Sequence, residues 1–188
     1  WSYRLLAADE QAMLRRLGVF QSGFSLEAAV VAGGDLSDSD VPGLLWTLVD
    51  KSLVAVDLTA NETRYRLLET MRAYARQLAG GRGEQAGTAR RLAMWWLERV
   101  GPWHRVDRKR AGEIQVELDN MRALVELVAE DDEEQAQQLA CSIGHYYYTV
   151  QAPRDAVDEL SRYAAQLATP SPARVSLLAT LALLATAT

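Results

Sequence analysis

The stretch LVAVDLTANETRYRLLETMRAYA, residues 53–75, decides the fold because its hydrophobic period changes within it. Leu53–Leu58 and Arg64–Leu68 are short segments of the kind that form β-strands, and the polar stretch TANE (59–62) lies between them. Together they predict a β-hairpin. From Glu69 onward apolar residues recur every three or four positions, which predicts an amphipathic helix that follows the second strand directly.

Three helical segments precede this hairpin. Residues 9–18 place acids in a first turn, and residues 25–34 begin at Ser25, a good N-cap. Residues 40–50 combine a capping aspartate with a proline that fits a first turn. Three helices followed by a hairpin is the order of a winged-helix domain, which we predict for residues 1–79.

The rest of the chain, from residue 80 onward, has a different sequence pattern. Residues 80–87, GGRGEQAG, contain four glycines and little to bury, so we predict a linker there. Residues 88–188 contain consecutive helical patterns with short breaks, which is typical of antiparallel helix pairs. The pair around Ala140–Ala168 has the small-residue and aromatic texture of a tetratricopeptide-type repeat. The predicted fold class is mainly α: a winged-helix domain with a short β-hairpin, then an α-helical, tetratricopeptide-like repeat domain that we expect to be truncated.

Composition places the chain among soluble proteins. Its 188 residues are 49% hydrophobic and 24% charged, and no apolar run reaches the roughly 18 residues of a membrane span. The net charge is −5, and neither half is basic: residues 1–87 hold 9 Lys and Arg against 11 Asp and Glu, and residues 88–188 hold 11 against 14. One cysteine cannot form an internal disulfide. We expect a cytoplasmic protein that binds no membrane.

No arrangement of residues points to catalysis. The sequence has no phosphate-binding G-x-x-x-x-G-K-[ST] segment. Cys141 and His145 stand one helical turn apart, but no further ligand or catalytic partner accompanies them, and their surroundings are typical of a helix core. We therefore expect no enzyme activity, no catalytic residues, no metal site and no cofactor in this chain.

The third predicted helix bears on DNA binding. A recognition helix offers Arg, Lys, Asn or Gln to bases and phosphates. The residues that this helix would present are Gly43, Thr47 and Asp50, with Lys51 only at its end. Aspartates at its start would repel phosphate, and Arg64 and Arg66 on the hairpin provide only a weak, salt-sensitive attachment. These features argue against DNA binding by this chain, and a DNA-binding winged helix is kept as the first alternative function.

Five segments in this order carry a family resemblance. They are WSYRLL (1–6), LRRLGVFQSGFSLEAA (14–29), LLWTLVDKSLV (44–54), RYRLLETMRAYA (64–75) and ELDNMRALVELV (117–128). They resemble the region that follows the nucleotide-binding module in bacterial STAND-class regulators, the NB-ARC-containing proteins related to SARP- and LuxR-type transcriptional regulators. The resemblance covers roughly Trp1 to Leu167.

The resemblance implies a non-catalytic role in signal transduction and transcription regulation. The chain would relay nucleotide state between an upstream ATPase domain, which binds ATP or ADP, and its own helical array. That array would sense another protein or a small inducer. Eukaryotic relatives carry a Met-His-Asp motif after the wing, whereas the matching stretch here is Leu67-Leu68-Glu69, without the histidine. The residues left for a nucleotide-state relay are Arg66, Glu69 and Arg72.

A second alternative function is a protein-interaction scaffold. Two aromatic runs in the predicted helices offer side chains of the kind that dominate protein interfaces. They are Trp95, Trp96, Tyr146, Tyr147 and Tyr148. Adjacent residues cannot all face one way on a helix, so we expect some of these rings to be exposed.

Overall fold

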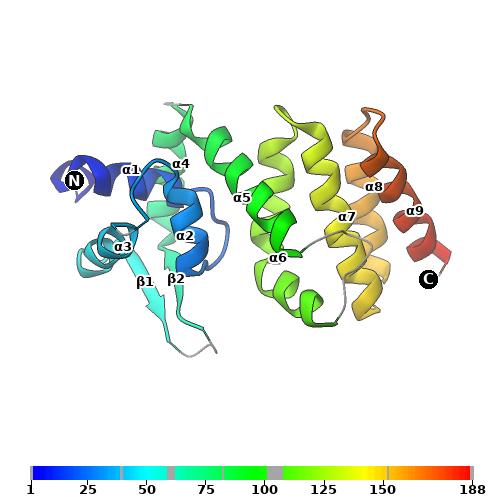
Figure 1. The fold of residues 1–188 in the computed structure, drawn as a ribbon, viewed down its shortest axis with the longest axis horizontal. Coiled ribbons are helices and arrows are strands. Elements are labelled where there is room, and N and C mark those ends of the chain that lie inside the picture. Colours follow the sequence, from blue (N-terminus) through cyan, green and yellow to red (C-terminus); the bar gives the residue numbers. More distant parts are fainter. Residues whose placement is uncertain are drawn as a thin grey trace. The chain divides into compact units, whose positions relative to one another are not determined.

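The computed structural model describes residues 2–38, 40–58, 62–81, 83–100, 108–151 and 153–186, and the predicted turn TANE lies mostly outside them. The described chain is mainly helical with one two-stranded antiparallel hairpin (Figure 1). It divides into two compact units, Trp1–Leu92 and Ala93–Thr188. The predicted fold class, a mainly α chain with helices, a hairpin and further helices, is confirmed.

The elements follow each other as predicted, with ends that differ by a few residues. In chain order they are η1 (Ser2–Leu5), α1 (Ala8–Leu17), α2 (Leu26–Gly33), α3 (Val41–Asp50), β1 (Val54–Asp57), β2 (Arg64–Leu67), α4 (Glu69–Gly80), α5 (Glu84–Val100), α6 (Arg108–Val128), α7 (Glu133–Val150), α8 (Pro153–Gln166) and α9 (Pro172–Thr186).

The first unit is built on a core between its three first helices. Met13, Leu14 and Leu17 of α1 are fully buried, as are Leu45 and Leu48 of α3. These positions are the apolar stripes that the sequence places at helical spacing, and burying such a stripe is the main source of helix stability in a domain. Ser25 caps α2 as predicted, because its side chain accepts a hydrogen bond from the Ala28 amide at 3.1 Å.

A short extended segment before α2 ties the hairpin to this core. Phe24 pairs with Tyr65 of β2 through two backbone hydrogen bonds, each 2.8 Å long. The Phe24 ring is fully buried, lies 4.4 Å from the Phe20 ring and stacks on Tyr65 at 6.1 Å between centroids. This bridge fixes where the hairpin leaves the helical core.

More than half of the predicted linker is helical, because α4 includes Gly80 and α5 begins within the linker. Helix α5 begins at Glu84, so residues 84–87 belong to it. The cause is a long-range ion pair: the Arg15 guanidinium contacts both carboxylate oxygens of Glu84, at 2.7 and 2.8 Å. A carboxylate in the first turn also suits the helix dipole. These contacts outweigh the flexibility expected from the glycines, while the domain boundaries remain a prediction.

The second unit contains the end of α5 and the helices α6, α7, α8 and α9, which lie side by side (Figure 1). Helix α7 is the central one, and it carries buried small residues along much of its length. At Gly144 the neighbouring helices come very close. A Cβ at this position would lie 2.9 Å from the Thr180 side chain of α9 and 3.1 Å from Leu160 of α8.

We predict that Gly144→Ala destabilises the chain by about 1–3 kcal/mol, because the added methyl overpacks the junction of three helices. Gly112→Ala is the matched control: it also lies inside a helix, α6, but a Cβ there meets nothing within 4 Å. That control should be neutral or slightly stabilising, since alanine is the better helix former. Thermal unfolding followed by circular dichroism measures both, and equal midpoints would contradict the close packing at Gly144.

Candidate nucleic-acid interface

Helix α3 presents an outward face that carries no cation. Its inward residues pack into the core, so the exposed positions are Gly43, Trp46 and Asp50, with Thr47 half-buried beside them. Trp46 is the largest exposed group, with 59% of its surface accessible. The Thr47 hydroxyl donates to the Gly43 carbonyl at 3.0 Å. The prediction for this face named Gly43, Thr47 and Asp50 but missed Trp46.

The hairpin carries the outward arginines of the first unit. Arg66 is exposed on β2 opposite Ala55, while its neighbours Tyr65 and Leu67 are buried. Arg64 lies on the same side of the strand, opposite Asp57, and donates to the Gly23 carbonyl at 2.6 Å. Arg66 therefore stands out as an outward cation on the described part of the hairpin.

Lys51, at the end of α3, is partly engaged elsewhere. Its ammonium lies 2.6 Å from a Glu10 carboxylate oxygen of α1. The hydrogen bond from Lys51 holds the pKa of Glu10 below its ordinary value. Lys51 is itself exposed, and ion pairs at the protein surface are weak. Lys51 can therefore exchange Glu10 for a phosphate at little cost.

Other arginines of the first unit donate to backbone carbonyls rather than to solvent. Arg76 of α4 donates to the Gly18 carbonyl at 2.8 Å, and Arg72 donates to the Gln21 carbonyl. Arg91 of α5 donates to the Ala32 carbonyl at 3.1 Å. Arg76 and Arg72 thus hold the segment after α1 against α4.

The three predicted relay residues do not form one cluster. Glu69 and Arg72 make an ion pair within the first turns of α4. Arg66 points outward from β2, and no hydrogen bond or ion pair joins it to the other two in the described chain. Their assignment to a nucleotide-state relay stays a prediction.

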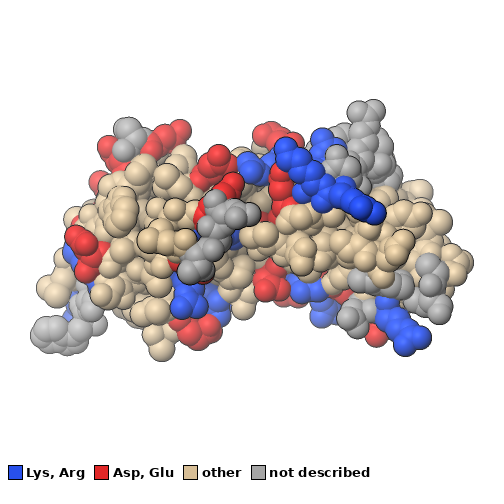
Figure 2. Space-filling model, turned by 90° about the horizontal axis from the view of Figure 1, so that it is seen from below, with Lys and Arg blue, Asp and Glu red and all other residues tan. Residues whose placement is uncertain are grey.

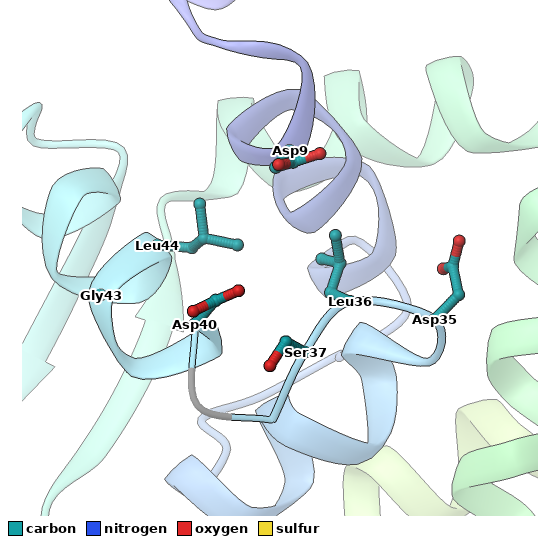
Figure 3. A pocket seen from close by; sticks show the side chains of 7 residues that line it. All are labelled: Asp9, Asp35, Leu36, Ser37, Asp40, Gly43 and Leu44. Atoms are coloured by element: carbon teal, nitrogen blue, oxygen red, sulfur yellow. The ribbon is translucent and has the colours of Figure 1, made fainter.

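An open hollow of about 650 Å³ lies at the start of α3 (Figure 3). Leu36, Leu44 and Asp40 surround it, with Asp9 of α1 across from them. Asp35 points away from the centre toward Arg16, whose hydrogen bond lowers the Asp35 pKa. The carboxylates give this end of α3 a negative field, which repels phosphate. Among the described residues, no group of three or more His, Cys, Asp or Glu could hold a metal ion.

Charges of both signs are mixed over the first unit. On the face in Figure 2, its blue and red side chains, on the left of the view, are interspersed among tan ones. No continuous positive field is visible there. An attachment to a polyanion through this unit would therefore depend on a few individual cations and on uncharged contacts.

The predicted aromatic partner contacts divide between core and surface. Trp96, Tyr146 and Tyr147 are buried in the second unit, and Trp95 is half-buried. Tyr148 is 56% exposed near the end of α7. Successive side chains point in different directions around a helix, so a run of three cannot be buried on one side. Tyr148 is the member of the set whose position best suits a partner contact.

Cys141 has the properties of a core residue. It is fully buried, its thiol donates to the Ala173 carbonyl at 3.2 Å, and burial raises its pKa to about 12. A thiol in this environment does not form the thiolate that nucleophilic chemistry requires. No described helix combines the length and the apolar character that crossing a membrane requires.

The comparison with known families identifies the class of the first unit. Residues 6–79 match the family described as "Winged helix-turn-helix domain". The match covers α1, α2, α3, the hairpin and α4 up to its last turn. These residues form a winged helix-turn-helix domain, as predicted.

The chain is homologous to proteins named as regulators of transcription. It is 41% identical over 128 residues to "Putative HTH-type transcriptional regulator Rv0890c" of Mycobacterium tuberculosis (strain ATCC 25618 / H37Rv), which covers 65% of this chain and 14% of the relative. It is 38% identical over 87 residues to "Uncharacterized protein Rv0894" of the same strain, covering 45% of this chain and 22% of that protein. The chain thus spans about one seventh of the length of the first relative. No solved structure matches the chain significantly.

These findings overturn the expectation that DNA binding is improbable for this chain. A winged helix-turn-helix match and homology to HTH-type regulators both point toward DNA. The expectation rested on the few cations of α3 and the hairpin, on the aspartates at the start of α3 and on the net charge. These charges are a poor guide by themselves, because phosphate contacts also come from backbone amides, and bases are also read by uncharged groups.

Proposed function

We propose that this chain is a DNA-binding regulatory module that acts without catalysis of its own. The observation that carries the proposal is the winged helix-turn-helix domain at residues 6–79. Homology to HTH-type transcriptional regulators supports regulation of transcription as its setting. In this account α3 enters the major groove and the hairpin follows the adjacent backbone.

The charge distribution supports a weak, salt-sensitive attachment. Arg66 on the hairpin and Lys51 at the end of α3 are placed to meet phosphates, with Arg64 beside them. Two or three phosphate contacts correspond to a salt slope of about −2 to −3 in log K against log salt. The carboxylates around the start of α3 oppose phosphate contacts there. The geometry therefore favours phosphate contacts from the wing and from Lys51 at the end of α3.

The experiment that tests this attachment is a single-arginine comparison. We predict that Arg66→Ala weakens binding to a random-sequence duplex by about tenfold and makes the salt slope about 1 unit less steep, because one phosphate contact is lost. Arg154→Ala removes an exposed arginine of α8 in the second unit and should change neither quantity. Equal effects of the two substitutions in anisotropy titrations would contradict a role for the wing.

The more specific role, a relay of nucleotide state in a STAND-class regulator, rests on the sequence resemblance alone. Because the chain spans a small part of its curated relatives, the activity of the whole protein is likewise a proposal. In that setting the second unit would offer Tyr148, its exposed aromatic residue on α7, to another protein.

A further inference from the structure

Recognition of a base sequence needs groups that can reach base edges, and α3 supplies an unusual set. In a helix-turn-helix protein the N-terminal part of the recognition helix contacts the bases. The outward residues of α3 are Gly43 in its first turn, Trp46 in its middle, and Thr47 and Asp50 in its last turn. Apart from the Asp50 carboxylate at its end, α3 thus offers the bases one glycine, one large aromatic ring and one threonine.

This set excludes the commonest readouts. Bidentate pairing with guanine uses Arg or Lys, and bidentate pairing with adenine uses Asn or Gln. None of these four residue types occurs between Val41 and Asp50. The remaining partner in the major groove that suits an apolar side chain is the C5 methyl group of thymine.

The outward face of α3 is largely apolar in the structure, although it includes a threonine. The Thr47 hydroxyl donates its proton to the Gly43 carbonyl at 3.0 Å, so it can only accept from a base, while its methyl stays available for apolar contact. Trp46 exposes 59% of its surface although an indole of this size is usually buried on average. A Cβ at Gly43 would meet nothing within 4 Å, so the surface beside Trp46 is open to an approaching base pair.

We propose that the outward face of α3, formed by Gly43, Trp46 and Thr47, reads thymine methyl groups in the major groove, so that this domain prefers A·T-rich DNA. The inference rests on the proposed DNA binding and specifies it further. The affinity for DNA then comes from the cations of the wing, and the preference for thymine comes from the apolar face of α3. Because these are different residues, substitutions can change the two properties separately.

The test compares two duplexes that differ only in the methyl group. The intact chain is titrated with alternating poly(dA-dT) and with alternating poly(dA-dU) at low salt. Loss of each buried methyl contact should weaken binding about fourfold. We expect the deoxyuridine duplex to bind at least about fourfold more weakly than the thymidine duplex.

Three variants test which residues cause the difference in affinity between the thymidine and deoxyuridine duplexes. Trp46→Ala should weaken binding to the thymidine duplex and remove the difference between the two duplexes. Gly43→Ala, whose added methyl meets no protein atom, should weaken binding to both by filling the open surface. Arg66→Ala should weaken binding to both equally and preserve the difference. Circular dichroism of each variant verifies that the fold is kept.

The outcomes separate the two proposals. Binding to neither duplex at low salt would overturn the DNA-binding function itself. Salt-dependent binding with equal affinity for both duplexes would keep that function and overturn the thymine readout. Unchanged binding of Trp46→Ala to both duplexes would also overturn it, and would assign the exposed tryptophan to a protein partner instead.

Discussion

The Phe24→Ala variant is expected to lose about 3–5 kcal/mol of unfolding free energy, the cost of removing a buried phenylalanine ring and leaving a cavity. Phe24 is fully buried between Phe20 and Tyr65, and its backbone pairs with Tyr65 in both directions. Loss of the ring therefore weakens the joint between helical core and hairpin. Since the hairpin carries Arg66, the variant should also bind DNA more weakly under conditions where it remains folded.

Urea unfolding measures this effect. Leu58→Ala is the control, because Leu58 is also apolar and near the hairpin but 75% exposed. Its change should stay within about 0.5 kcal/mol, as for other surface substitutions. A loss below about 1 kcal/mol for Phe24→Ala would mean that the Phe24 ring does not support the core as described.

The Glu159→Gln variant is expected to lose about 2–3 kcal/mol, because it breaks a partly buried charge network in the second unit. The Glu159 carboxylate accepts hydrogen bonds from Arg122 at 2.8 and 2.9 Å, from the Tyr147 hydroxyl at 2.7 Å and from the Tyr163 hydroxyl at 3.0 Å. Its side chain is only 10% exposed. The network thereby joins α6, α7 and α8 at one point.

The effect of Glu159→Gln on stability should depend on pH. Burial alone would raise the pKa of Glu159, but the hydrogen bonds from Arg122, Tyr147 and Tyr163 together hold it below the ordinary value of 4.5. A lowered native pKa means that the stabilisation is present above pH 4.5 and is lost as the pH falls through the native pKa. The stability difference between wild type and Glu159→Gln should therefore be constant near neutral pH and shrink below about pH 4.5.

Asp119→Asn is the matched control for this network. Asp119 also pairs with Arg122, at 3.2 Å, but its side chain is 59% exposed. Exposed pairs contribute about 0–1 kcal/mol, so this variant should change stability little at any pH. Equal losses for the two variants in urea unfolding would contradict the importance of burial for the Glu159 network.

Local patterns in the sequence predicted the elements but not the contacts between them. The Ser25 cap, the strands on either side of the predicted turn and the helix from Glu69 all follow from short-range rules, and all are present. The bridge between Phe24 and Tyr65 could not be foreseen, since a single extended residue has no period. Nor could the bond from Arg76 to Gly18, which joins residues far apart in the chain.

The candidate interface was misjudged for a different reason. Trp46 lies three positions after Gly43 and so on the same helical face, a signal that was present in the sequence but was outweighed by the search for cations. Arg64 and Arg66 were recognised as outward residues of the hairpin, although Arg64 also binds the Gly23 carbonyl. Reasoning from charged side chains alone thus led to the wrong expectation about DNA.

Fluorescence anisotropy of the chain with a labelled random-sequence duplex, at about 50 mM and about 200 mM salt, measures DNA binding by this domain directly. We expect binding at the lower salt concentration that becomes roughly 15- to 60-fold weaker at the higher one, as expected for two or three phosphate contacts. Absence of binding at the lower concentration, where each phosphate contact is strongest, would contradict a DNA-binding function for this winged helix-turn-helix domain.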